Sequence, residues 1–200
     1  MKLKKRIAAI ALLVILPLAA CARVIVPPTE PAAEATAAPA AAETAAAAAE
    51  PFTFSGTALD GTSVDETLFT DHKLTMVNIW GTFCGYCIDE MPDLADLADE
   101  YADRGFQIVG VIGDIASLDG VPTDEERKTI DSLIEQTNAD YLHLLPMGDT
   151  VKLFLANTRA YPTTFFLDSA GNMLTKPVEG AQSRENWVKL IEALLDSVEK

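Results

Sequence analysis

The chain has 200 residues and carries 15 basic and 30 acidic side chains, which gives a formal net charge of −15. Nucleic acids are bound largely through lysine and arginine, so this balance argues against a nucleic-acid partner. It also disfavours adsorption to anionic lipid headgroups. The length allows one or two domains.

The first twenty residues have the pattern of a secretory signal peptide. Four positive charges lie within residues 1–6, and an apolar run follows from 7 to 20. This run is too short to span a bilayer as a mature helix, which needs about 20 residues. We therefore expect residues 1–20 to be removed, which takes away four basic residues and no acidic one.

The signal ends in Leu18-Ala19-Ala20-Cys21, which resembles the lipobox of bacterial lipoproteins. In that class, cleavage before the cysteine leaves it as a lipid-bearing N-terminus. The resemblance implies that acyl chains on Cys21 hold the protein on a lipid bilayer, and several chains together anchor firmly. An ordinary signal peptide with an incidental Cys21 is the alternative.

Residues 21–51 are predicted to be a disordered tether behind the lipidated Cys21. Ala, Pro, Glu and Thr dominate, and no Val, Ile, Leu or aromatic residue occurs between Val26 and Phe52. Such a segment cannot bury enough apolar surface to offset the entropy lost on ordering. Residues 52–200 then form one domain of ordinary size.

The apolar periodicity within residues 52–200 predicts an α/β fold. The expected elements, in chain order, are short strands at 52–54 and around a turn within 57–64, a buried strand at 74–80, a helix at 85–103, a strand at 106–113, a helix at 123–137, a strand at 141–145, a helix at 149–157, a hairpin of 163–168 with 173–178, and a helix at 183–199. Strands that alternate with helices, followed by a hairpin and a helix, indicate a mixed central sheet flanked by helices, with an N-terminal β-hairpin extension.

One cysteine pair remains once Cys21 carries lipid, and it lies in Cys84-Gly85-Tyr86-Cys87. A C-x-x-C pair can be half of a zinc site, part of a haem-attachment motif, a static disulfide or a redox pair. A structural zinc site needs four ligands, and the only histidines, His72 and His143, are isolated. A haem motif needs histidine where Ile88 stands. A static bridge over so short a loop constrains the unfolded chain little. We therefore favour a redox-active disulfide with no metal and no other cofactor, and expect both histidines to be structural.

The position of this pair supports redox chemistry. It follows the predicted strand 74–80 and opens the next helix, so that Cys84 lies at a helix N-terminus. Unpaired backbone N–H groups and the helix dipole stabilise a thiolate there. We predict that Cys84 is the nucleophile and that Cys87, one turn further, is the resolving thiol.

The segment 77–87, with the sequence VNIWGTFCGYC, resembles the active site of thioredoxin-fold proteins, in particular the exported TlpA/ResA-like group. Pro92 matches the helix-kinking proline of that family, and Tyr161-Pro162-Thr163 matches its cis-proline loop. The resemblance covers about residues 70 to 200. It implies a thioredoxin-like fold in which Pro162 and Thr163 lie against the disulfide and bind the partner's backbone. A proline that merely opens an edge strand is the alternative.

The surroundings of the pair bear on the direction of electron flow. We expect Trp80 and Phe83 to border the disulfide. Tyr86 stands where thioredoxins have proline, and its backbone N–H near the thiolate of Cys84 favours a more oxidising pair. Alternatively, Tyr86 only forms part of a docking surface.

Two polar residues are candidates for proton transfer or pKa tuning. Asn78 stands where cytosolic thioredoxins carry a buried acid, and a neutral amide cannot act as a base. Asp114 ends the predicted strand 106–113, where an acid approaches the active site in the ResA-like group. It is our candidate for tuning Cys87, and a solvated carboxylate is the alternative.

The resemblance implies a lipid-anchored thiol–disulfide oxidoreductase on the extracytoplasmic face of a bacterial membrane. The leading interpretation is a reductant of client protein disulfides that receives electrons from a membrane thiol carrier. Its clients are then haem-site cysteines of apocytochromes, misformed disulfides or a methionine sulfoxide reductase. An oxidase or isomerase uses the same pair with the opposite poise. A thioredoxin-fold binding or metal-delivery module is a third possibility, although copper-delivery relatives use C-x-x-x-C and a late histidine, which are missing from this sequence.

Overall fold

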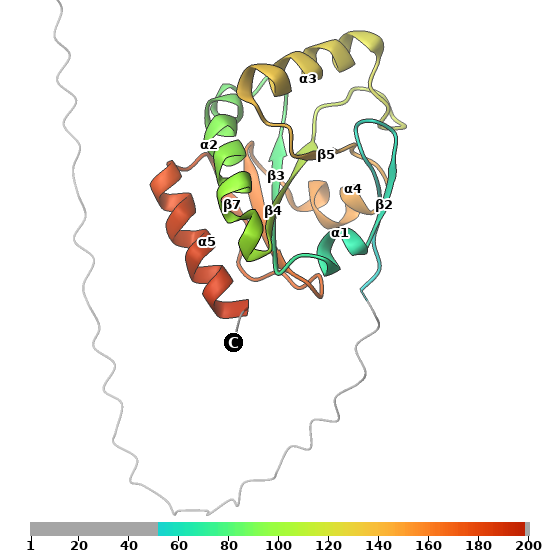
Figure 1. The fold of residues 1–200 in the computed structure, drawn as a ribbon. Coiled ribbons are helices and arrows are strands. Elements are labelled where there is room, and N and C mark those ends of the chain that lie inside the picture. Colours follow the sequence, from blue (N-terminus) through green and yellow to red (C-terminus); the bar gives the residue numbers. More distant parts are fainter. Residues whose placement is uncertain (1–51, 199–200) are drawn as a thin grey trace, which may run out of the picture. The chain divides into compact units, whose positions relative to one another are not determined.

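A five-stranded mixed sheet in the order β5-β4-β3-β6-β7 forms the centre of the computed structural model, which describes residues 52–198 (Figure 1). The signal peptide, Cys21 and the tether predicted from the sequence lie outside the described residues. The elements are β1 (Ser55–Thr57), β2 (Ser63–Asp65), α1 (Thr67–Thr70), β3 (Leu74–Trp80), α2 (Gly85–Tyr101), β4 (Phe106–Ile112), α3 (Asp124–Thr137), β5 (Leu142–Leu144), α4 (Asp149–Leu153), β6 (Thr163–Asp168), β7 (Val178–Glu179) and α5 (Arg184–Val198), with 3₁₀ turns at Ala102–Arg104 and Leu155–Asn157.

Strand β3 is the central strand, and all seven of its residues are buried. It pairs in parallel with β4, from Leu74 opposite Phe106 to Trp80 opposite Ile112, and antiparallel with β6. Strands covered on both faces read as continuous apolar runs, which is why the sequence reveals them. Because β3 and β4 end level with each other, the loops that follow them begin at the same edge of the sheet.

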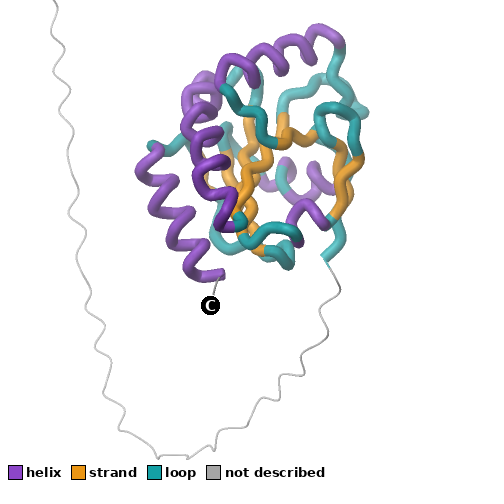
Figure 2. Tube along the Cα trace, in the orientation of Figure 1, coloured by secondary structure: helices purple, strands orange, loops and turns teal. Residues whose placement is uncertain are grey.

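The helices divide between the two faces of the sheet (Figure 2). On one face α2 and α5 pack against β3, and their contacts include Leu94 and Leu97 of α2 with Trp187 and Ile191 of α5. On the other face lie α1 and α4, with buried Phe69 in α1. Among residues 52–198 no helix is both long and apolar enough to cross a membrane.

The expected N-terminal hairpin is confirmed, since β1 and β2 pair antiparallel with Thr57 opposite Ser63. The prediction of a strand at 52–54 is wrong, because these residues form no regular secondary structure. Phe54 instead buries its ring against Phe69 of α1, edge to face at 5.1 Å between centroids, and this packing replaces strand pairing. After β1 the chain runs along the outer edge of β5, where the backbone N–H of Leu59 donates to the carbonyl of His143 at 2.8 Å.

The C-terminal hairpin is more irregular than its sequence pattern. Its first strand is β6. Its second arm pairs with β6 at two separate places, the isolated Leu167–Met173 bridge and the short strand β7. Pro177 lies between those two points, and proline has no N–H to donate to a ladder.

The capping box of α3 is present as predicted, because Thr123 and Glu126 exchange side-chain to backbone hydrogen bonds at 3.2 and 2.8 Å.

Candidate active site

Cys84 and Cys87 form a disulfide at the N-terminus of α2, with their Cα atoms 5.3 Å apart. Cys84 is the N-cap residue of the helix, and its Sγ accepts a hydrogen bond from the backbone N–H of Cys87 at 3.2 Å. The first N–H groups of a helix have no partner within the helix. A thiolate at Cys84 is a stronger acceptor for the same N–H, so this geometry favours negative charge on that sulfur.

The two cysteines differ in exposure. Cys87 is fully buried, whereas Cys84 keeps 7% of its surface exposed. On either side of Cys84, the aromatic residues Phe83 and Tyr86 are 69% and 75% exposed. Cys84 is therefore the cysteine that an incoming sulfur can approach, whereas Cys87 presents no surface. At Gly85 between the cysteines, an added Cβ meets no atom within 4 Å, so the start of the helix is open.

The loop that carries Pro162 lies beside the cysteine loop. The Tyr161–Pro162 peptide bond is cis, Pro162 is buried, and Thr163 pairs with Ile79 near the end of β3. The ring of Tyr161 meets that of Phe83 edge to face at 5.5 Å between centroids. The fold thus brings together the two motifs that the sequence placed about 75 residues apart.

Asp114 lies at the same end of the sheet, immediately after β4. Its Oδ2 accepts hydrogen bonds from the backbone N–H of Thr82 at 2.7 Å and from the Thr82 hydroxyl at 2.6 Å. The carboxylate therefore contacts the loop that leads into Cys84. The expected role in tuning Cys87 remains a prediction.

Asn78 is fully buried in β3, where its Nδ2 donates to Glu90 and to the Thr164 hydroxyl, each at 3.1 Å. Glu90 is a residue that the sequence reasoning missed. Its other oxygen accepts the backbone N–H of Gln182 at 3.1 Å. Burial raises the pKa of Glu90, and the hydrogen bonds from Gln182 and Asn78 oppose that rise. Glu90 follows Cys87 by three residues, and this spacing places both on one face of the helix.

Trp80 packs in the same buried cluster as Cys84 and Cys87. Its indole N–H donates to Nδ1 of His143 at 3.1 Å, and Nε2 of His143 lies 2.8 Å from the Ala139 carbonyl. Burial lowers the pKa of His143 to about 4.

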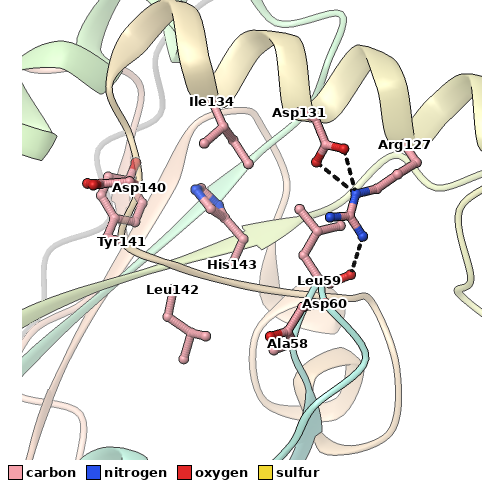
Figure 3. A pocket seen from close by; sticks show the side chains of 10 residues that line it. All are labelled: Ala58, Leu59, Asp60, Arg127, Asp131, Ile134, Asp140, Tyr141, Leu142 and His143. Carbon is pink, nitrogen blue, oxygen red and sulfur yellow. Dashed lines mark hydrogen bonds and ion pairs between the residues drawn. The ribbon is translucent and has the colours of Figure 1, made fainter.

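His143 also lines a cavity of about 340 Å³ between α3, β5 and residues 58–60 (Figure 3). Arg127 lines this cavity and donates to the Leu59 carbonyl at 2.7 Å, and neither cysteine lines it. Within residues 52–198, no group of three or more His, Cys, Asp or Glu side chains could hold a metal ion.

Comparison with known proteins places this geometry in a family context. The sequence profile of the Redoxin family matches residues 37–191. The thiol–disulfide oxidoreductase ResA of Bacillus thuringiensis subsp. konkukian is 26% identical over 142 residues, which cover 70% of this chain and 74% of that protein.

Two solved structures show the same fold. A thiol:disulfide interchange protein of the thioredoxin family from Chlorobium tepidum superposes with a TM-score of 0.55 at 23% identity, covering 72% of this chain and 93% of the other. The exposed lipoprotein thioredoxin Etrx1 of Streptococcus pneumoniae gives 0.51 at 20% identity, covering 71% and 99%. These superpositions confirm the expected thioredoxin-like fold.

Proposed function

Because the chain belongs to the Redoxin family and is a thioredoxin-like thiol–disulfide oxidoreductase, we propose that it reduces disulfides in client proteins at the extracytoplasmic face of a bacterial membrane. The arrangement of the two sulfurs carries this proposal. Cys84 keeps a small exposed surface and its sulfur accepts a helix N–H, whereas Cys87 is fully buried one turn further along the helix. That is the arrangement needed for a nucleophile and a resolving thiol.

The reaction begins with the reduced pair. The Cys84 thiolate attacks one sulfur of the client disulfide, a mixed disulfide forms, and the first client sulfur leaves as a thiolate that takes up a proton. Cys87 then loses its proton and attacks Sγ of Cys84. The second client thiolate leaves and is protonated, and the Cys84–Cys87 disulfide forms. The client gains two electrons and two protons. A membrane dithiol carrier then supplies two electrons and two protons to the Cys84–Cys87 disulfide and restores the dithiol.

The surrounding residues support the docking of a client. Phe83 and Tyr86 offer exposed aromatic surface next to Cys84, and Pro162 with Thr163 lies on the adjacent loop. We propose that a client segment binds across these two loops. The reducing direction, and the clients named above, rest on the TlpA/ResA-like resemblance of residues 77–87.

Attachment to the membrane through lipid on Cys21 is part of the same proposal. It is supported by the lipobox-like sequence 18–21 and by the fold shared with an exposed lipoprotein. We expect Cys21→Ser to move the protein from the membrane fraction to the soluble extracytoplasmic fraction. Retention of this variant in the membrane would contradict lipid anchoring and leave the redox proposal intact.

Replacement of the resolving thiol tests the function directly. In cells, Cys87→Ser should accumulate disulfide-linked complexes through Cys84, which dissolve on reduction and whose partners are identified by mass spectrometry. The matched control, Cys84→Ser with Cys87 retained, should trap far less because Cys87 is buried. A wild-type pair held mainly as a dithiol supports the reductant, whereas a pair held mainly as a disulfide indicates an oxidase. The absence of complexes, together with no reduction of insulin by the purified protein, would contradict the proposal.

A further inference from the structure

We propose that the Gly113–Asp114 segment after β4 is a clamp that fixes the cysteine loop and the cis-proline loop relative to each other. Thr82, Asp114 and Tyr161 are then positioning residues. The inference rests on the proposed function, because it assigns to these residues the alignment of a client with Cys84. It is independent of the direction of electron flow.

The first half of the clamp holds the cysteine loop. Oδ2 of Asp114 accepts both the backbone N–H and the hydroxyl of Thr82, at 2.7 and 2.6 Å. Hydrogen bonds to a charged acceptor are shorter and stronger than neutral ones. Two residues further on, the N–H of Cys84 donates to the Gly81 carbonyl at 3.0 Å and closes a turn. Residues 81–84 are thus tied to the end of β4 immediately before the reactive sulfur.

The second half of the clamp holds the cis-proline loop. The Tyr161 hydroxyl donates to the Gly113 carbonyl at 3.0 Å, and the Gly113 N–H donates to the Trp80 carbonyl at 2.9 Å. A single peptide segment therefore bonds to both loops. On the exposed side, the edge-to-face contact between Phe83 and Tyr161 joins the same two loops.

Two glycines permit this close approach. An ideal Cβ at Gly113 lies 2.3 Å from the Tyr161 hydroxyl oxygen, and one at Gly81 lies 2.9 Å from the Phe83 ring and 3.3 Å from Cγ of Asp114. Any side chain at position 113 must displace Tyr161 from its bond. The close approach of Tyr161 to the clamp therefore depends on the absence of a side chain at Gly113.

A prealigned pair of loops lowers the ordering cost that a client must meet on binding, and it holds the attacking sulfur in a productive geometry. This role differs from that of a proton relay. A relay depends on the charge of Asp114, whereas a clamp also depends on the Thr82 hydroxyl and on Tyr161. Variants of the three residues therefore separate the two roles.

The test uses the full-length protein in detergent micelles, with insulin reduction as the assay. Thr82→Val removes one donor and leaves the Asp114 charge, and we expect kcat/KM to fall about tenfold, as for the loss of a hydrogen bond to a charged group. Thr82→Ser restores the hydroxyl and should restore the rate. Asp114→Asn should lower kcat/KM without moving the pH profile. If Asp114→Asn moves that profile while Thr82→Val has no effect, the carboxylate acts on cysteine titration and the clamp is wrong.

A double-mutant cycle tests whether the two loops are coupled. Tyr161→Phe removes only the hydroxyl that bonds to Gly113. Combined with Thr82→Val, it should lower kcat/KM by clearly less than the product of the single losses, since both changes release the same segment, Gly113–Asp114. Multiplicative losses, within a factor of two, would show independent loops and overturn the inference.

Amide hydrogen exchange supplies a readout that does not depend on turnover. In the oxidised protein, Tyr161→Phe should speed exchange of the Thr82 amide at least fivefold, although residue 161 does not bond to it. Unchanged exchange would contradict the clamp. If the wild type fails to reduce insulin and Cys87→Ser traps no complexes in cells, the proposed function is wrong, and this measurement still decides on the clamp.

Discussion

The indole N–H of Trp80 and Nδ1 of His143 form a buried hydrogen bond of 3.1 Å, and Trp80 belongs to the same hydrophobic cluster as Cys84 and Cys87. The indole can only donate, and the Ala139 carbonyl at the other ring nitrogen can only accept. His143 must therefore be neutral, with its proton on Nε2. Burial lowers the pKa of His143 to about 4, against the opposing effect of the hydrogen bond to the Ala139 carbonyl. Protonation of Nδ1 would also break the bond to Trp80.

The first prediction concerns stability in mild acid. Between pH 7 and 5 the unfolded chain protonates His143 and the folded protein does not, so stability falls as the pH falls. From a folded-state pKa of about 4 and an ordinary value of 6.5, this group alone accounts for about 2 kcal/mol at pH 5. His143→Asn keeps an acceptor near Trp80 and lacks this titration. Its destabilisation, measured by urea unfolding, should shrink by about 2 kcal/mol from pH 7 to pH 5. A deficit that stays constant with pH would contradict the assignment.

The second prediction has the opposite sign. Because burial raises the pKa of Glu90, the folded protein holds this proton more tightly than the unfolded chain does. The stabilisation is present at low pH and is lost as the pH rises through the folded-state pKa. Glu90→Gln cannot ionise, so its free energy of unfolding relative to the wild type should increase from pH 5 to pH 8. Chemical denaturation at both values checks this, and a difference that is flat or falls with pH contradicts it.

The third prediction concerns redox poise at Tyr86. Proline is tolerated in the first turn of a helix and removes one backbone N–H near Cys84. Fewer donors stabilise the thiolate less, so Tyr86→Pro should make the pair more reducing, by roughly 30 mV for a tenfold change in thiolate stabilisation. Equilibration with glutathione measures the shift. Tyr86→Ala keeps the N–H and should leave the potential unchanged. Equal potentials in both variants would limit Tyr86 to client docking.

The fourth prediction concerns Gly110 in β4, which pairs with His143 of the neighbouring strand β5. A Cβ at this position comes within 2.2 Å of Nδ1 of His143. Gly110→Ala should therefore destabilise the protein by about 1–3 kcal/mol through overpacking. Gly85→Ala is the matched control, since a Cβ there meets nothing within 4 Å. Thermal unfolding compares the two variants, and equal midpoints would contradict the packing argument.

Local patterns predicted most of the fold, because each depends on a few neighbouring residues. The apolar runs of β3 and β4 mark strands buried on both faces, and the reciprocal bonds of Thr123 and Glu126 follow from a capping-box spacing. The second arm of the C-terminal hairpin, predicted as a strand at 173–178, is shortened to Val178–Glu179, and Pro177 within it has no N–H for a ladder hydrogen bond. The predicted strand at 52–54 failed because an apolar residue such as Phe54 can bury its ring without pairing its backbone.

The polar contacts of the site depend on tertiary packing, and the sequence does not determine them. His143 looked isolated because its partner Trp80 is 63 residues away, and no local spacing joins them. Asp114 was placed correctly at the end of a strand, but its bond to Thr82 requires the parallel register of β3 and β4. Glu90 follows the same rule: its i,i+3 relation to Cys87 is visible in the sequence, but its partners Asn78 and Gln182 lie 12 and 92 residues away.

The segment that follows β1 along β5 has a further consequence. It occupies the outer edge of the sheet, through the Ala58–Leu144 bridge and the hydrogen bond from the Leu145 N–H to the Thr57 carbonyl at 2.8 Å. Open sheet edges are templates for self-association between chains. A covered β5 edge does not offer its backbone N–H and C=O groups to a strand of a neighbouring molecule. The N-terminal extension thereby closes this edge of the sheet to strand addition.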